Sequence, residues 1–429
     1  MNRKERRANR KQESREHEAI ARTSGNAGLL TLASDHQEQG RPREAVKLLK
    51  QILAREPGNA AAHDHIAMAY QAFGRRDDAV HHFSQAISFG LRDIDSLVRQ
   101  SPVMIAALGR FARTYPARLP LAELLGSENA VADDIRLLGL LQSELVRDIE
   151  TELFLTAIRR ELLDAQTGEK PLELADNVLD LACAVAQQCF LTEYVYALSD
   201  AERGLAAQLK DRVAQTGAAS APADIAVLGC YLPLRSLPDA AKLLDRRWPK
   251  PVDTLLTRQV REPLAEAADI SAIPALTAVE GKTSEMVQQQ YEESPYPRWT
   301  VALPTRPTTF EAYLRERFGV TGASGDEILI AGCGTGEQSI NNAQTFPQSK
   351  VLAIDISRTS LAYARRRTRE LRVRNIEYAQ ADILKLGSIG RSFDFIESVG
   401  VLHHMAEPEA GWRSLLSLLR TGGMMRIAL

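Results

Sequence analysis

The chain has 429 residues, of which 45% are hydrophobic and 25% are charged; these are ordinary values for a globular protein, and the length suggests about two to four domains. The formal net charge of −2 gives no overall reason to expect nucleic acid or an anionic membrane as a partner. No run of about 18 apolar residues occurs, so the sequence predicts no membrane-spanning helix.

The N-terminal segment at 1–25 begins with the basic run MNRKERRANRKQ. No apolar run follows it, as a secretory signal would require, so we expect a basic, disordered tail. The cysteines form no CxxC pair and no cluster with histidines at zinc-binding spacing; they are Cys183, Cys189, Cys230 and Cys333. Buried free thiols are the simplest interpretation, and they predict a protein of the reducing cytoplasm.

Residues 26–93 contain an internal repeat with an offset of 34 residues. Small and larger apolar side chains recur at matching positions: Ala33 with Ala67, Ala45 with Ala79, Leu49 with Phe83, and Ile52 with Ala86. The offset and the pattern resemble the tetratricopeptide repeat, in which small side chains let two antiparallel helices approach closely. The resemblance implies one of two roles: a surface that binds a protein or peptide partner, or a helical cap that packs on its own chain.

Four histidines lie in the second repeat, at His63, His65, His81 and His82. Convergence of these side chains on a metal ion is one interpretation. Residues at i and i+2 do not share a helix face, however, which favours ordinary core or surface histidines. The sequence therefore predicts no metal site.

Residues 94–262 keep a helical pattern and predict a helical middle domain. Apolar residues recur every four positions at Leu137, Leu141, Leu145, Ile149 and Leu153. Residues 225–232 (IAVLGCYL) form a short apolar run that fits either a strand or a buried helix. We find no catalytic motif in this region.

Residues 263–325 begin with a stretch rich in alanine and proline and predict a linker. Within it, residues 291–299 have the sequence YEESPYPRW. The two prolines favour an extended path, because proline fixes its own φ and pushes the preceding residue out of the helical region. Aromatic side chains on such a segment are typical of a lid or a packing clamp.

A different pattern begins at Asp326 and continues over residues 326–429. Short apolar strands alternate with helices: strands are expected at 327–331, 351–355, 376–381, 393–398 and 424–429, and helices from about 337, at 357–371 and at 408–419. Such alternation predicts a parallel sheet wound by right-handed crossovers. Ligands of these sheets bind at the carboxyl ends of the strands, where the winding direction changes.

The residues at those strand ends indicate a nucleoside cofactor. The loop at 332–336 (GCGTG) follows the first strand, and its glycines let the backbone approach a ligand and turn tightly into a helix. Asp355 ends the second strand, where a carboxylate accepts hydrogen bonds from ribose hydroxyls. Asp382 ends the third strand, where it can accept a hydrogen bond from an adenine amino group. Glu337 occupies the place of the third glycine of a dinucleotide fingerprint and would repel a pyrophosphate, so a nicotinamide oxidoreductase fits poorly.

Four segments, ILIAGCGTG, VLAIDIS, AQADIL and FDFIESVGVLHHM, together resemble the class I S-adenosylmethionine-dependent methyltransferases. The resemblance implies an α + α/β chain, in which a Rossmann-like doubly wound parallel sheet follows the helical repeats. It also implies methyl transfer from S-adenosylmethionine to an unidentified acceptor, with the repeats selecting a protein partner or substrate. The alternative is a non-catalytic adaptor that keeps a vestigial cofactor-binding domain.

The resemblance further implies which residues face the methionine part of the cofactor. These are the backbone groups of Gly332, Cys333, Gly334 and Gly336. Many members have an acidic residue near the first motif that is directed at the methionine amino group, whereas this chain has Ile330 and Ala331 there. The amino group would therefore bind backbone carbonyls or Glu337.

The nucleoside and the methyl acceptor have their own implied residues. Asp355 would bind the ribose and Ile356 would contact the adenine, whose edge Asp382 and Ile383 would hold. The acceptor would approach the sulfonium beside the segment that begins at Val399. His403 and His404 follow this segment and are weak candidates for a general base, although local packing explains them as well.

Two further features complete the sequence-based picture. Six arginines lie on and just after the second helix of this domain and predict a solvated helix face, without favouring nucleic acid: Arg365, Arg366, Arg367, Arg369, Arg372 and Arg374. The sequence stops after the predicted fifth strand, whereas class I domains usually add two antiparallel strands. We therefore expect the domain at 326–429 to be incomplete.

Overall fold

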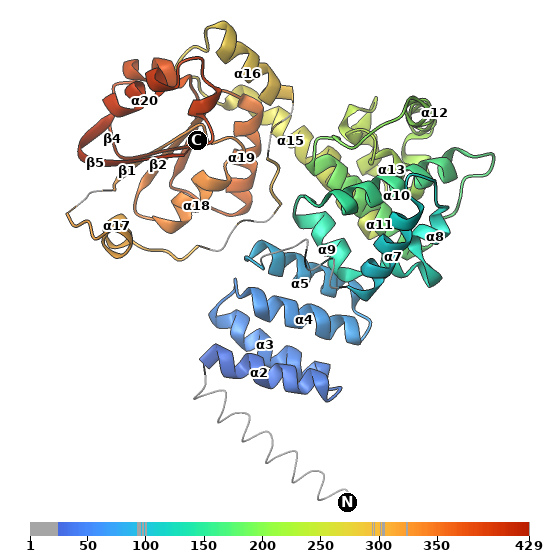
Figure 1. Cartoon of the computed structure of the whole chain (residues 1–429). Helices are drawn as coiled ribbons and strands as arrows, with labels where there is room; N and C mark the ends of the chain where they lie inside the picture. Colours follow the sequence, from blue (N-terminus) through green and yellow to red (C-terminus); the bar gives the residue numbers. More distant parts are fainter. Residues whose placement is uncertain are drawn as a thin grey trace, which may run out of the picture. The chain divides into compact units, whose positions relative to one another are not determined.

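The computed structural model of the chain is shown in Figure 1. It describes residues 25–91, 96, 98, 101–293, 295, 297–300, 302, 305–322 and 325–428. Apart from Gly25, the predicted basic tail lies outside the described residues. The chain divides into two compact units: unit 1 comprises Met1–Leu232 and Trp248–Val252, and unit 2 comprises Pro233–Arg247 and Asp253–Leu429. Within the described part, none of the helices combines the length and the apolar character that crossing a membrane requires.

Unit 1 begins with two helix pairs, which confirm the predicted repeat. They are α2 (Gly25–Glu38) with α3 (Pro42–Arg55), and α4 (Ala60–Ala72) with α5 (Arg76–Ser88). The repeated alanines are fully buried: Ala33, Ala45, Ala67 and Ala79. Because a methyl side chain takes little space, the paired helices can pack closely, and the larger Leu49 and Phe83 fill the remaining volume.

The remaining α-helices of unit 1 with described bounds form a second bundle that includes α11 (Asp176–Leu191), which is buried from Leu181 to its end. The others are α7 (Pro102–Thr114), α8 (Leu121–Leu125), α9 (Ile135–Ser143), α10 (Ile149–Thr167), α12 (Asp200–Thr216) and α13 (Pro222–Leu228). The apolar run at 225–232 therefore begins within a helix and not in a strand. All four cysteines of the chain are buried and free, as predicted.

The four-residue apolar period at 137–153 does not correspond to one helix. The backbone N–H of Thr151 donates to the Asp148 carboxylate at 2.9 Å, which caps the start of α10. A side-chain oxygen at this position satisfies an N–H group that has no partner within the helix, and it fixes where the helix starts. Ile149, which the period places on the buried face, is 62% exposed.

The boundary between the middle domain and the linker differs from the expectation. The chain enters unit 2 at Pro233, well before residue 262. Residues at the start of the expected linker form α15 (Glu262–Asp269), which packs against α19 (Arg358–Glu370). Proline is compatible with a helix in its first turn, where the missing N–H has no intrahelical partner, and Pro263 lies there.

Three more helices complete the segment that precedes the sheet. They are α14 (Lys250–Leu256), α16 (Lys282–Glu293) and α17 (Phe310–Phe318). Phe310 and Leu314 of α17 are buried and belong to the same apolar core as the sheet. Residues 262–293 and 310–318 are thus structured parts of unit 2, although the sequence predicted a linker there.

The sheet of unit 2 has five parallel strands in the order β3-β2-β1-β4-β5. The strands are β1 (Glu327–Ala331), β2 (Lys350–Asp355), β3 (Ile376–Gln380), β4 (Phe393–Val399) and β5 (Leu419–Ala428). Helices cover both faces: α18 (Glu337–Thr345) and α19 pack on one, and α20 (Pro408–Ser417) packs on the other (Figure 1). This arrangement confirms the predicted Rossmann-like doubly wound sheet.

The winding reverses at β1, whose neighbours are β2 on one side and β4 on the other. Loops that leave the carboxyl ends of β1 and β4 therefore diverge, and a crevice forms between them. The fifth strand begins earlier than the predicted residue 424, at Leu419, and its pairing with β4 shifts register between Phe393 and Phe395.

Candidate functional site

The chain turns sharply at Gly332, immediately after β1. Gly332 has a φ of +78°, and its N–H donates to the Ile354 carbonyl at 2.9 Å. A Cβ atom added here would lie 2.3 Å from Cγ2 of Val401. Only glycine fits this position, because both the backbone conformation and the neighbouring side chain exclude a larger residue.

Gly336 ends the same loop and has a different role. It precedes α18 with a φ of +86°, and a Cβ atom there would lie 2.4 Å from Cβ of Ala364 on α19. Its N–H donates to the Cys333 carbonyl at 2.9 Å. The glycine thus lets two helices approach each other, and it does not line the cavity described below.

Asp355, at the end of β2, connects two loops. One carboxylate oxygen accepts from the N–H of Gly334 at 2.7 Å, and the other accepts from the N–H of Ser357 at 2.9 Å. Burial raises the pKa of the Asp355 carboxyl, while these two N–H groups act in the opposite direction. The side chain therefore holds the glycine loop against the start of α19.

Asp382, just after β3, has one oxygen that is paired and one that is not. Its Oδ1 accepts from the N–H of Leu384 at 2.9 Å, which caps a short 3-10 helix (Ile383–Ser388). Its Oδ2 is buried and has no hydrogen-bond partner among the described residues. A buried carboxylate oxygen without a donor is costly, so this atom is suited to a ligand that brings an N–H or O–H group.

Gly332, Asp355 and Asp382 border one cavity of about 610 Å³ at the carboxyl ends of the strands. The predicted cofactor residues that line it are Gly332, Cys333, Gly334, Glu337, Asp355, Ile356, Asp382, Ile383 and Val399. The cavity volume lies within the range of ordinary small-molecule sites. His404 also lines the cavity, whereas His403 does not, although the two imidazole rings are 4.1 Å apart between centroids.

One wall of the cavity was not foreseen from the sequence. It is formed by α16 and the residues before it, which run beside the edge strand β3. The N–H of Leu276 donates to the Gln380 carbonyl, and the N–H of Asp382 donates to Oγ1 of Thr277. Thr283, Val287 and Tyr291 line the cavity at intervals of four residues and so share one face of α16. This spacing was a usable signal in the sequence.

The segment that follows α16 behaves as a packing clamp at its end. The indole Nε1 of Trp299 donates to the Thr335 carbonyl at 3.0 Å, and the Thr335 hydroxyl donates to the Pro297 carbonyl. Trp299 is 7% exposed. Within the same segment, Tyr296 lies outside the described residues.

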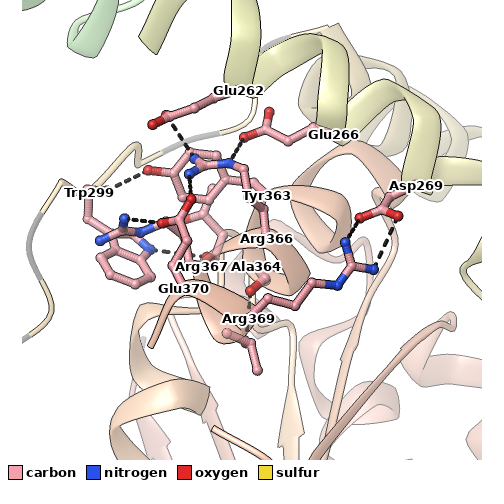
Figure 2. Close-up of polar contacts among 12 residues, drawn as sticks. Glu262, Glu266, Asp269, Trp299, Tyr363, Ala364, Arg366, Arg367, Arg369 and Glu370 are labelled. Atoms are coloured by element: carbon pink, nitrogen blue, oxygen red, sulfur yellow. Dashed lines mark hydrogen bonds and ion pairs between the residues drawn. The ribbon is translucent and has the colours of Figure 1, made fainter. Parts of the chain in front are cut away.

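The predicted solvated helix face is correct for only part of the arginine run: Arg369, Arg372 and Arg374 are exposed, whereas Arg366 is buried and Arg365 and Arg367 are half-buried. Arg366 is 8% exposed, and its guanidinium lies among the carboxylates of Glu262, Glu266 and Glu370 (Figure 2). Arg367 stacks on the ring of Trp299 with 4.4 Å from its guanidinium carbon to the ring centroid. The pattern was misleading for Arg366 because two of its acidic partners, Glu262 and Glu266, lie on α15, about a hundred residues earlier.

The histidines of the second repeat belong to unit 1, and three of them, His63, His65 and His82, are within hydrogen-bond distance of protein atoms. Nδ1 of His63 lies 2.9 Å from Nδ1 of His82, and Nε2 of His63 lies 3.1 Å from the Pro57 carbonyl. Nε2 of His63 must carry a proton to meet that carbonyl, so in neutral His63 the Nδ1 atom accepts from His82. Across the described residues, no group of three or more histidine, cysteine or acidic side chains is arranged to hold a metal ion.

Comparison with known proteins identifies two regions of the chain. Residues 328–423 match the family model of a methyltransferase domain, and residues 36–90 match that of a tetratricopeptide repeat. An uncharacterized protein of Synechococcus sp. is 39% identical over 101 residues, which are 23% of this chain and 24% of that protein. The trans-aconitate 2-methyltransferase of Deinococcus radiodurans is 34% identical over 101 residues, which are 24% of this chain and 36% of the enzyme.

A solved structure with detectable similarity is PKMT2 from Rickettsia typhi in complex with AdoHcy. It is 25% identical, with a TM-score of 0.26, over 30% of this chain and 26% of that chain. The matches to the Synechococcus and Deinococcus proteins span 24% and 36% of their lengths, so this chain covers only a minor part of these relatives.

Proposed function

We propose that the domain at 328–423, which its family match identifies as a methyltransferase domain, binds S-adenosylmethionine in the 610 Å³ cavity and transfers the methyl group to an acceptor. The observation that carries this proposal is the unpartnered Oδ2 of Asp382. It lies on the wall of a cavity at the carboxyl ends of the strands, and the adenine amino group is a donor that fits it.

The nucleoside part of the cofactor has its proposed contacts on two strand ends. Asp355 accepts from the ribose hydroxyls, and Ile356 lies against the adenine. Asp382 and Ile383 bind the adenine edge. The half-buried position of Asp355 on the cavity wall supports its role, because the carboxylate already anchors two loops and still borders the open space.

The methionine part has its proposed contacts on the glycine loop. The backbone of Gly332, Cys333 and Gly334 borders this end of the cavity, and the absence of a side chain at Gly332 keeps the space open. Glu337 begins α18 and lines the cavity. We assign it to the methionine amino group, which needs an acceptor that Ile330 and Ala331 do not supply.

Bound S-adenosylmethionine supplies a methyl group on a sulfonium, which is a good leaving group. The chain's own residues then align the acceptor with the cofactor and exclude water. Val399 and His404 line the cavity where the acceptor would enter. We assign His404 to accept a proton from the acceptor, because its imidazole lines the cavity and a neutral ring has a nitrogen that can accept a proton, and His403 to its support through ring contact.

The repeat match at 36–90 supports the proposal that this region binds a protein or peptide partner, because stacked helical repeats form extended binding surfaces. We propose that this partner is the acceptor or brings the acceptor to the domain. The four free, buried cysteines support a reducing cytoplasmic location.

Titration calorimetry with S-adenosylhomocysteine tests the proposed site. We expect Asp382→Ala to weaken binding roughly 10- to 100-fold, because a hydrogen bond to a charged group contributes about 1.5–3 kcal/mol. Asp382→Asn keeps an acceptor oxygen and should bind with intermediate affinity. Asp253→Ala, at an exposed residue of α14, is the charge-matched control and should bind like the wild type.

Equal affinity of the wild type and Asp382→Ala would contradict the adenine assignment. Absence of binding by the folded wild-type chain would favour the non-catalytic adaptor instead.

A further inference from the structure

The C-terminal end of α16 and the chain that follows it contact both loops that border the proposed cofactor cavity. Four described residues of this stretch make these contacts, and we call them the tether: Tyr291, Glu292, Pro297 and Trp299. One end of the tether binds the start of α19, next to Asp355. The other end binds the glycine loop after β1.

Glu292 caps a helix to which it does not belong. Its carboxylate accepts from the backbone N–H of Arg358 at 2.7 Å and from that of Thr359 at 3.0 Å. The Thr359 hydroxyl also donates to this carboxylate. The first N–H groups of a helix have no intrahelical partner and carry partial positive charge, so a carboxylate is the favoured cap.

The neighbouring contacts strengthen this attachment. The Ser357 hydroxyl donates to the Tyr291 carbonyl at 3.1 Å and accepts from the N–H of Ser360 at 3.1 Å. The first turn of α19 is thus held partly by its own cap and partly by the end of α16. Glu292 also lies near enough to Asp355 to raise the pKa of that carboxyl, although burial is the larger cause.

Trp299 fixes the other end of the tether. Its ring contacts both Arg367 and Tyr363 of α19, and the Tyr363 hydroxyl donates to its carbonyl (Figure 2). Its indole N–H donates to Thr335 in the glycine loop. The glycine loop and the start of α19 are therefore joined by the tether as well as by Asp355.

The helix in which the tether begins, α16, forms a wall of the cavity. Thr283, Val287 and Tyr291 face the cavity from α16, which packs on α19. Gly281 precedes this helix with a φ of +99°. Because α16 carries few buried side chains of its own, its placement depends on the contacts at its C-terminal end.

We infer that Glu292 is a positioning residue for cofactor binding. By capping α19, it holds α16 over the cavity and keeps the ribose-side loop in place. The inference rests on the proposed function, because it assumes that the cavity binds S-adenosylmethionine. Glu292 itself does not line the cavity, so its effect on affinity acts through the loop and the helix.

The test compares three variants of the full chain by calorimetry with S-adenosylhomocysteine and by hydrogen exchange of α16. We expect Glu292→Ala to weaken binding about tenfold and to speed exchange in α16, since loss of a helix cap has this order of effect. Glu292→Gln keeps one acceptor oxygen and should restore part of the affinity. Glu285→Ala removes an exposed carboxylate from the same helix and should stay within about twofold of the wild type.

The outcomes separate this inference from the proposed function. If the wild type binds and Glu292→Ala binds with the same affinity, the inference is overturned but the proposed function is not. Weakening in Glu292→Ala without any recovery in Glu292→Gln would also overturn it, because a cap should respond to a remaining acceptor. Absence of binding by the wild type would contradict the proposed function and the inference with it.

Discussion

Gly332 combines a left-handed backbone conformation with almost no space for a side chain. Its φ is +78°, and an added Cβ atom would meet Val401 at 2.3 Å. The loop that follows lines the cavity, so the geometry at this residue determines where the glycine-loop backbone lies. Gly332 is thus needed both for the turn after β1 and for the open volume beside it.

Gly332→Ala should destabilise unit 2 by about 2–4 kcal/mol, because a left-handed residue costs about 1–2 kcal/mol and overpacking adds a similar amount. Gly387→Ala is the matched control, since no atom lies within 4 Å of its Cβ position and its φ is not positive. We expect the control to stay within about 0.5 kcal/mol of the wild type. Urea unfolding followed by tryptophan fluorescence measures both, and equal losses in the two variants would contradict the steric explanation.

His82 predicts a pH dependence of the repeat helices. Burial, together with the nearby His63, lowers its pKa to about 4. When the pKa of a histidine is lower in the folded state than its value of about 6.5 in the unfolded state, the fold is most stable above pH 6.5. As the pH falls toward the folded-state pKa, protons bind preferentially to the unfolded state, and stability is lost. Protection of α4 and α5 from hydrogen exchange should therefore decrease between about pH 7.5 and pH 5.

His82→Gln should reduce this decrease, because glutamine can still donate to His63 but does not titrate. His65→Gln, in the same repeat, is the control and should keep the wild-type decrease. A decrease of the same size in His82→Gln would show that other groups cause it.

At the residue scale, sequence patterns located the cavity-lining residues but not their bonds. The glycines, Asp355 and Asp382 stand at strand ends, and strand ends can be found from short apolar runs. The bonds from Gly334 and Ser357 to Asp355 depend on how two loops fold toward each other. The role of Gly336, which lets α18 and α19 approach each other and does not line the cavity, likewise depends on the neighbouring Ala364.

At the element scale, the main departure from expectation is α15. The helix is short, so its amphipathic pattern extends over few residues. Its ion-pair partners Arg366 and Arg369 lie about a hundred positions further along the chain. Local periodicity carries no information about such pairing, which is why the arginines of α19 were expected to face solvent. Because α15 packs on α19, the start of the predicted linker is a fixed part of unit 2 (Figure 2).

Arg366→Met should destabilise unit 2 by about 3–5 kcal/mol, because removing one partner leaves the buried carboxylate of Glu266 without compensation. Glu266 is 4% exposed and Arg366 8%. Arg413→Met is the control, since its pair with Glu409 is exposed, and it should cost about 0–0.5 kcal/mol. Urea unfolding measures the difference, and similar losses in both variants would contradict a stabilising role for the α15–α19 network.

The Arg366→Met effect should also depend on pH. Burial raises the pKa of Glu266, and the charge of Arg366 opposes this shift in the wild type. A carboxyl whose folded-state pKa is raised destabilises the fold above that pKa and ceases to do so when it is protonated. The loss of stability should therefore be smaller at about pH 5 than at about pH 8.

At the scale of the whole molecule, the chain joins a repeat region to a methyltransferase domain. Both regions were recognisable from the sequence because each has a strong period: 34 residues in the repeats, and strand–helix alternation in the domain. The stretch directly before the domain, from 233 to 325, has neither, and its helices α15 and α16 pack on α19 of the domain. Its boundaries could not be inferred from local composition.

The central claim is that the cavity beside Gly332, Asp355 and Asp382 binds the methyl donor. Calorimetric titration of the full chain with S-adenosylhomocysteine, with NAD titrated in parallel, tests it most directly. We predict saturable binding of one S-adenosylhomocysteine per chain at micromolar concentration, corresponding to about −8 kcal/mol, and much weaker binding of NAD. Absence of S-adenosylhomocysteine binding to the folded chain, or tighter binding of NAD, would contradict it.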